Sequence, residues 1–198
     1  MPPKLLILCA GNGTRIKSMV KHKLKPMIKV AGKPVLQHII EHAKKFGITD
    51  ICINVHHEPD QIMGYFGDQL NYYYEPELLG TAGAVKKIGK YLGKDFIVMN
   101  GDTLTDVDLE ELYQCHIRNR SKGVLATMSV NPKNMHHTGT HVLSYKILSM
   151  FPKTGLLDDT INDHKKVASL LIAFPNEHYF DIGTPKGLRR ARRFFRRG

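Results

Sequence analysis

Short apolar runs alternate along the chain with segments whose apolar residues recur at helical spacing. Residues 4–9 (KLLILC) are almost continuously apolar and are closed by Gly11, a pattern typical of a strand buried on both faces of a parallel sheet. Residues 34–46 have helical periodicity, with Pro34 suited to a first turn and Gly47 to a C-terminal cap. The pattern therefore predicts a strand, a loop and a crossover helix.

The alternation continues along the chain and predicts an α/β protein. Strands are expected at residues 50–55, 72–74, 96–99 and 123–130, and helices at residues 60–66, 82–92 and 106–118. Less regular patterns then predict strands at residues 141–143, 167–174 and 179–182, and helices at residues 145–150 and 185–197. Because no internal repeat or linker interrupts the series, we expect one domain over residues 1–198, with a basic C-terminal helix at about 185–197.

Composition places the chain among globular proteins. Of 198 residues, 42% are hydrophobic and 24% are charged, which excludes disordered and collagen-like classes. No apolar run approaches the roughly 18 residues of a membrane span, and the N-terminal residues do not form a secretory signal. Cys9, Cys52 and Cys115 have no metal-type spacing. We therefore expect reduced thiols, a cytoplasmic location and no membrane partner.

The basic charge is concentrated in two segments. The net charge is +11, but residues 15–33 and 189–198 together carry +13, so the rest of the chain carries −2. A uniformly basic surface, common among nucleic-acid-binding proteins, is therefore not expected, and we predict no nucleic-acid partner.

The arginine-rich C-terminus has a simpler interpretation. We expect Leu188, Ala191 and Phe195 to pack on the protein body while the arginines face water. Binding of nucleic acid or an anionic membrane is the alternative for this cluster. Phe194 and Phe195 could support a subunit contact, which leaves a homo-oligomer open.

Two loops follow predicted strands and carry candidate chemistry. Residues 11–15 (GNGTR) offer closely spaced backbone N–H groups that can bind phosphate oxygens, although a tight turn would explain the glycines equally well. The loop lacks the spacing of a Walker motif and the third glycine of a dinucleotide fingerprint. Residues 100–102 (NGD) end another strand. Since open α/β sheets bind ligands at the carboxyl ends of their strands, both loops are expected at one site.

Four motifs in this order resemble those of the sugar-1-phosphate nucleotidylyltransferases, also called nucleoside-diphosphate-sugar pyrophosphorylases. The family signature has a strand, G-x-G-T-R, nine residues and K-P, and residues 8–15 (LCAGNGTR) precede Lys25-Pro26 at that spacing. The other matches are residues 74–83 (YEPELLGTAG), like the base-recognition segment, residues 100–102, like the metal-binding strand end, and residues 180–185 (FDIGTP), like the second metal-binding segment. The resemblance implies a Rossmann-like three-layer sandwich with a mostly parallel mixed sheet, of the nucleotide-diphospho-sugar transferase type.

The resemblance also implies a reaction, in which a nucleoside monophosphate passes from a nucleoside triphosphate to a sugar 1-phosphate with release of pyrophosphate. Mg²⁺ is the implied cofactor. The implied roles are phosphate binding by Arg15 and by the loop of Ala10, Gly11, Asn12, Gly13 and Thr14; charge neutralisation between the two substrates by Lys25; Mg²⁺ binding by Asp102 and Asp181; nucleoside binding by Gly80, Thr81 and Asn100; and acceptance of a hydrogen bond from the base by Glu75. Arg15, Lys25 and Asp102 are thus the expected catalytic residues.

Residues 75–83 are most similar to the mannose-1-phosphate and heptose-1-phosphate guanylyltransferases, which makes GTP and a mannose-like sugar 1-phosphate the expected substrates. The amino-sugar uridylyltransferases have similar motifs and provide the alternative. A sugar phosphate, with a second pKa of about 6, is largely a dianion at neutral pH, so no general base is required.

One segment departs from the family pattern. Between Val130 and Thr138 the family has a longer stretch with a Glu-Lys-Pro motif that binds the sugar phosphate, whereas here only residues 131–137 (NPKNMHH) stand in its place. The acceptor site is rebuilt from other residues, with Lys133 a candidate, or acceptor binding is weakened or lost, or a segment is absent from the sequence. Loss of acceptor binding would make the chain a catalytically silent nucleotide-binding relative.

The eleven histidines suggest a zinc site only weakly. Residues 56–57 and 136–137 are adjacent histidine pairs, but neighbouring side chains on a strand point to opposite faces and cannot easily share one ion. We therefore expect these histidines to be solvated or incidental.

Overall fold

The centre of the protein is a seven-stranded sheet. The computed structural model describes residues 2–11, 24–133, 135, 137–163, 167–174 and 178–196. The strand order is β10-β8-β9-β6-β1-β4-β5, and only β9 runs antiparallel to its neighbours within this described sheet. The strands are β1 (Leu5–Leu8), β4 (Ile51–Val55), β5 (Asn71–Tyr74), β6 (Asp95–Asn100), β8 (Ala126–Val130), β9 (His137–Ser144) and β10 (Ser169–Ala173). The predicted mostly parallel mixed sheet is confirmed.

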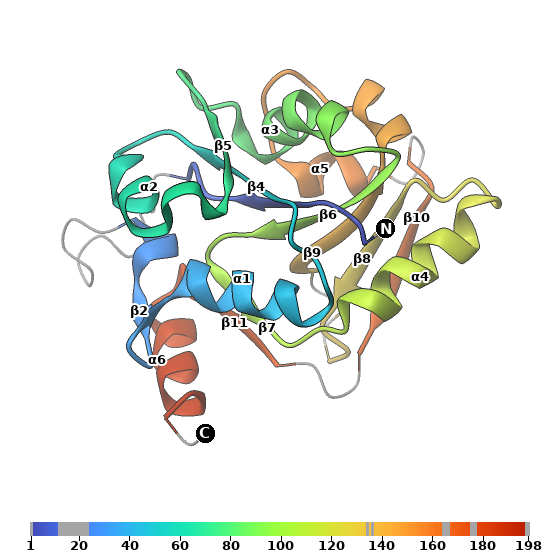
Figure 1. Ribbon diagram of the computed structural model, residues 1–198. Coiled ribbons are helices and arrows are strands. Elements are labelled where there is room, and N and C mark those ends of the chain that lie inside the picture. Colours follow the sequence, from blue (N-terminus) through green and yellow to red (C-terminus); the bar gives the residue numbers. More distant parts are fainter. Residues whose placement is uncertain are drawn as a thin grey trace.

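Helices cover both faces of the sheet and make three layers (Figure 1). Alternate residues of β1 divide between two separate clusters of buried side chains: Leu5 and Ile7 belong to the first cluster and Leu6 to the second. The first cluster includes side chains of α1 (Val35–Lys45), α2 (Asp60–Phe66), α4 (Leu109–Arg120) and α6 (Pro185–Phe194); the second includes side chains of α3 (Gly80–Ile88) and α5 (Leu157–Ile161).

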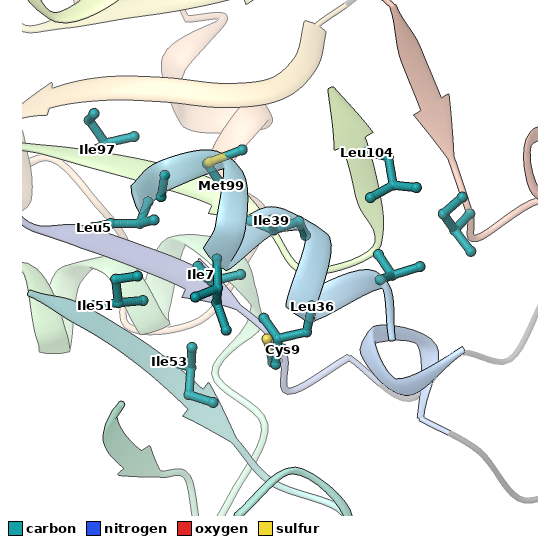
Figure 2. Close-up of a cluster of buried hydrophobic side chains, with 14 of the residues drawn as sticks. Leu5, Ile7, Cys9, Leu36, Ile39, Ile51, Ile53, Ile97, Met99 and Leu104 are labelled. Atoms are coloured by element: carbon teal, nitrogen blue, oxygen red, sulfur yellow. The ribbon is translucent and has the colours of Figure 1, made fainter. Parts of the chain in front are cut away.

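The first cluster anchors α1 under the sheet. Figure 2 shows Leu36 and Ile39 of this helix among Ile7 of β1 and Met99 of β6. All four side chains are at most 2% exposed. Burial of large aliphatic side chains stabilises a fold by roughly 1.5–3 kcal/mol each, so this interface holds the loops at the ends of β1 and β6 on a rigid base.

Several short elements differ from the predictions. The sequence did not indicate the hairpin of β2 (Lys29–Val30) and β3 (Lys33–Pro34), β7 (Thr103–Thr105) or α5, whereas the strand expected at residues 179–182 is β11 (Tyr179–Asp181), which pairs with β7. Elements this short show too little of a period to be recognised. The helix expected at residues 145–150 is the 3₁₀ helix η5 (Tyr145–Ser149), which follows η2 (Lys25–Met27), η3 (Gly67–Gln69) and η4 (Gly89–Tyr91).

The C-terminal helix α6 packs as expected. Leu188 and Ala191 are fully buried, and Phe195 is partly buried against the first cluster, whereas Arg189, Arg192, Arg193 and Arg196 are exposed along the helix. The helix ends at Phe194, short of the predicted residue 197. None of the helices in the described part of the chain has both the length and the apolar character to cross a bilayer.

Candidate active site

A pocket of about 340 Å³ opens at the carboxyl ends of β1, β4 and β6. The strand register places Leu8 beside both Asn54 and Asn100, so the loops that leave these three strands meet at one edge. The predicted site residues that line the pocket are Ala10, Gly11, Lys25, Glu75, Gly80, Thr81, Asn100 and Asp102. Asn12, Gly13, Thr14 and Arg15 lie outside the described residues.

Lys25 and Asp102 form a partly buried ion pair at one side of the pocket, with 2.8 Å between Nζ and Oδ2. Asp181 is next to this pair although it is not among the lining residues of the pocket. A Cβ added at Gly183 would lie 2.8 Å from Oδ1 of Asp181 and 3.0 Å from both Asp102 Oδ2 and Lys25 Nζ. The three predicted charged residues therefore surround one point, although Lys25 and Asp181 are 156 positions apart in the sequence.

Gly101 explains how Asp102 reaches this position. A Cβ at residue 101 would lie 2.7 Å from Cys9 Sγ and 2.8 Å from the carbonyl oxygen of Leu8, so only glycine fits where β6 ends against β1. The carbonyl of Asp102 accepts a hydrogen bond from the backbone N–H of Ile182 at 2.9 Å, which ties Asp102 to the segment of Asp181. The structure thus joins two motifs that the sequence shows separately.

Cys9 lies in the wall of the pocket, but its thiol is not reactive. Burial strongly raises the pKa of its thiol, and the carboxylate of Asp102 raises it further. The thiol therefore remains protonated at neutral pH and is not a nucleophile.

Asn54 and Glu75 form the buried floor of the pocket. Asn54 Oδ1 accepts a hydrogen bond from the backbone N–H of Cys9 at 2.7 Å, and its Nδ2 donates to Glu75 Oε1 at 2.8 Å. Glu75 Oε2 accepts from the backbone N–H of Leu79 at 3.2 Å. The two side chains therefore connect β1, β4 and the loop before α3. Glu75 remains a predicted acceptor for the base, although Oε1 already accepts from Asn54 and Oε2 from the loop before α3.

The sequence analysis did not include Asn54 in the site, although the sequence contains a pattern that could have indicated it. It is the one amide side chain in the otherwise apolar segment 51–55, and it is 3% exposed. Buried amides in a strand require hydrogen-bond partners, so a polar residue in such a run marks a place where the strand contacts a loop.

Gly80 and Thr81 connect the pocket to the segment before α5. Thr81 Oγ1 accepts a hydrogen bond from the backbone N–H of Leu157 at 2.7 Å. Gly80 has a φ of 69°, and a Cβ there would collide with the carbonyl of Gly155. This contact brings Leu156, Leu157 and Asp158 into the pocket wall, a set of lining residues that the sequence did not indicate.

Lys133 does not line this pocket. It is exposed in the short connection between β8 and β9, and its backbone N–H donates to Asn131 Oδ1 at 2.9 Å. Its role as a replacement acceptor ligand stays a prediction.

Asp102 and Asp181 have the donor chemistry that Mg²⁺ requires. Two carboxylates around one small space offer hard oxygen ligands, and the missing Cβ of Gly183 keeps that space open. Lys25 at the same point can neutralise anionic oxygens. The arrangement can hold a polyanionic ligand with one metal ion.

The fold and the site together define an α/β protein with a charged ligand pocket at the carboxyl edge of its sheet. Residues 4–139 match the family model described as nucleotidyl transferase. The chain belongs to the nucleotidyl transferase family.

Relatives and solved structures agree with this membership. The D-glycero-alpha-D-manno-heptose 1-phosphate guanylyltransferase of Campylobacter jejuni is 32% identical over 91% of this chain and 95% of its own length. The UTP–glucose-1-phosphate uridylyltransferase of Synechocystis is 34% identical to this chain. The aligned region covers 63% of this chain and 36% of that relative. The crystal structure of HddC from Yersinia pseudotuberculosis superposes with a TM-score of 0.79 at 24% identity, covering 98% of this chain and all of that one. The crystal structure of the Yersinia pseudotuberculosis protein has also been determined in complex with GMP-PN.

Proposed function

We propose that this chain transfers GMP from GTP to a sugar 1-phosphate, releasing pyrophosphate and forming a GDP-sugar. The observation that carries the proposal is the convergence of Lys25, Asp102 and Asp181 on one point beside the pocket. The guanine base and a heptose or mannose 1-phosphate acceptor are supported by the similarity to the Campylobacter jejuni guanylyltransferase over nearly its whole length.

The chemistry requires positioning and charge neutralisation rather than a base. An oxygen of the sugar phosphate forms a bond to the α-phosphorus of GTP as the bond from that phosphorus to pyrophosphate breaks. Asp102 and Asp181 would hold Mg²⁺, which supplies charge neutralisation at the α-phosphate. Lys25 Nζ, which lies 2.8 Å from Asp102 Oδ2, would bind oxygens of both reacting phosphates. Arg15 and the loop of residues 11–14 are expected to bind the leaving pyrophosphate.

The nucleoside would lie over α3 and the end of β6. Gly80, Thr81 and Asn100 line the pocket together with the exposed apolar side chain of Leu156. Since ligand pockets combine apolar walls with a few fixed polar groups, this end suits a base and ribose better than a phosphate.

The short connection between β8 and β9 favours a second candidate. The expected Glu-Lys-Pro segment is absent, so the chain could bind a nucleotide without transferring it, as a regulatory subunit.

A uridylyltransferase is the alternative enzyme and is supported by the similarity to the Synechocystis relative. The three cysteines are free thiols, which supports the expected cytoplasmic location.

Pyrophosphate release tests the proposal. GTP, UTP, dTTP, CTP and ATP are each combined with Mg²⁺ and with mannose, heptose, glucose or N-acetylglucosamine 1-phosphate. Turnover with GTP and one acceptor supports the proposed reaction, whereas turnover with UTP alone supports the alternative enzyme. If no combination releases pyrophosphate but a nucleotide still raises Tm, the result supports the hypothesis that the chain is a nucleotide-binding regulatory subunit.

Asp102→Asn tests the site within the same assay. Loss of one metal-binding carboxylate is expected to lower kcat by at least about 100-fold, a magnitude typical of losing one electrostatic catalytic group. Asp68→Asn, on the exposed helix η3, is the matched control and should retain full activity. Full Mg²⁺-dependent turnover by the Asp102 variant would refute the site.

A further inference from the structure

A second group of potential metal ligands lies next to the active-site pocket, outside the Lys25–Asp102–Asp181 cluster. His137, His141 and Asp158 each offer one ligand atom, and these atoms lie within 4.8 Å of one another. His141 Nε2 is 3.4 Å from Asp158 Oδ1, and the two imidazole rings are 5.9 Å apart. The ligands come from β9 and α5, two elements held together across the second face of the sheet.

A bulge in β9 brings the two histidines together. Met128 pairs with His141 and Val130 with His137, so β9 has three residues where β8 has one. Gly139, with a φ of 76°, lies within this irregular stretch. Residues four apart on a regular strand would be about 13 Å apart, whereas the two imidazole rings here are 5.9 Å apart. The earlier expectation considered only adjacent histidines and did not include this pair.

His141 is buried without a hydrogen-bond partner among the described residues. Its side chain is 1% exposed, and neither Nδ1 nor Nε2 has an acceptor or donor in good geometry, the 3.4 Å approach of Asp158 included. A buried polar group without a partner is costly, which points to a ligand that completes the group.

Each histidine has a buried ring nitrogen that lacks a hydrogen-bond partner among the described residues and can therefore coordinate a metal. His137 Nε2 lies 3.0 Å from Asn162 Oδ1, which can only accept, so Nε2 carries the proton. This leaves Nδ1 of His137 to coordinate the metal, since it is buried and has no hydrogen-bond partner in the part of the chain that the structure describes.

We propose that His137, His141 and Asp158 bind a divalent transition-metal ion of the zinc class. Two imidazole nitrogens and one carboxylate oxygen are a ligand set that Zn²⁺ favours and that Mg²⁺ does not. Three protein ligands leave a fourth position open. Asp158 is half-exposed and lines the pocket, and water or an oxygen of a bound substrate would complete the site. The proposal does not depend on the nucleotidyl transfer proposed above.

Metal titration of the full chain tests the site. Protein stripped with a chelator is titrated with Zn²⁺ against a chromogenic chelator, and with Co²⁺ while its visible absorption is recorded. We expect one tightly bound ion, unaffected by millimolar Mg²⁺, with the intense visible bands of four-coordinate Co²⁺ and a higher Tm in the presence of Zn²⁺.

Variants assign the ion to these residues. Loss of even an outer-shell partner weakens metal binding about 10–100-fold, so His137→Ala and Asp158→Asn should each weaken Zn²⁺ binding by more than about tenfold. Asp158 is half-exposed, so its variant should fold even if a variant of buried His141 does not. Asn162→Ala should weaken binding by about tenfold through His137.

Two controls separate this site from other metal ligands. Asp102→Asn removes a carboxylate of the active-site pair, and His178→Ala removes a surface histidine 2.7 Å from Asp106; both should bind Zn²⁺ as the parent chain does. Absence of Zn²⁺ binding, unchanged affinity in both ligand variants, or loss of binding in the Asp102 variant alone would each overturn the proposal.

Discussion

At the scale of single residues, Gly139 affects two sites at once. Its φ of 76° belongs to the bulge that brings His137 near His141, and a Cβ there would lie 2.6 Å from Asn100 Nδ2. Asn100 lines the pocket at the end of β6. The glycine therefore allows the β9 backbone to pass close to a side chain that is expected to contact the nucleoside.

Gly139→Ala should destabilise the protein by about 1–2 kcal/mol and raise KM for the nucleotide, because the new methyl group displaces Asn100. Gly123→Ala is the matched control: its φ is 88°, but nothing lies within 4 Å of the added Cβ. Urea unfolding should show a similar loss of stability in both variants, and steady-state kinetics should show a raised KM in the first alone. An equal KM in the two variants would contradict the role of Asn100.

At the scale of elements, the first turn of α6 connects helix capping with the active site. Thr184 Oγ1 accepts a hydrogen bond from the Gly187 backbone N–H at 3.1 Å and donates to the Asp181 carbonyl at 3.0 Å. Asp181 Oδ1 in turn accepts from the Gly183 N–H at 2.8 Å. The cap thus holds the backbone of a predicted metal ligand.

Thr184→Ala should lower the free energy of unfolding by about 1 kcal/mol and raise the Mg²⁺ concentration needed for half-maximal activity. Asp108 caps α4 in the same way, accepting from the Glu111 N–H at 2.9 Å, but lies away from the pocket. Asp108→Ala should therefore match the loss of stability in denaturant titrations without changing the Mg²⁺ requirement. A changed requirement in both variants would show a general effect of destabilisation.

The contact of α4 with the sheet should depend on pH. Burial lowers the pKa of His116, against the opposing effect of Asp95, which lies 3.3 Å away. A histidine whose pKa is lower in the folded than in the unfolded state contributes stability above its unfolded pKa of about 6.5, and that stability is lost as the pH falls.

His116→Gln should consequently be less stable than the parent chain at pH 8, with a difference that narrows toward pH 5. Urea unfolding at several pH values provides the measurement, and His57→Gln, an exposed surface variant, provides the control. A difference that widens as the pH falls would mean that the ion pair with Asp95 outweighs burial.

At the scale of the whole molecule, ligand binding at the strand ends should stabilise the entire fold. The pocket draws residues from β1, β4, β6, η2, α3 and α5, so a ligand connects segments that are far apart in the sequence. A ligand at 100 times its Kd contributes about 2.7 kcal/mol.

GTP with Mg²⁺ should therefore raise Tm by about 5–10 °C in a scanning-fluorescence experiment. Asp181→Asn should reduce the shift, because it removes a carboxylate that we propose binds Mg²⁺. A shift that is the same without Mg²⁺ in both chains would contradict the proposed metal site.

The alternation of apolar runs and amphipathic segments determined the α/β class, and the motif spacings determined most of the pocket. These signals are local, because the alternation of apolar residues in a strand and the glycines of a loop can be recognised in the sequence without knowledge of tertiary contacts. Ala10, Gly11, Lys25 and Asp102 line the pocket because strands that run parallel end at the same edge.

Only the tertiary structure decided the contacts between distant segments. Asn54 reaches Glu75, Gly155 contacts Gly80, and Asp158 approaches His141 because of strand register and the packing of a five-residue helix. No local pattern encodes these distances, since each depends on the sum of many packed contacts. The sequence by itself therefore determined the class of fold and the pocket residues Lys25, Glu75 and Asp102, and the fold decided which other side chains, Asp158 among them, complete the pocket.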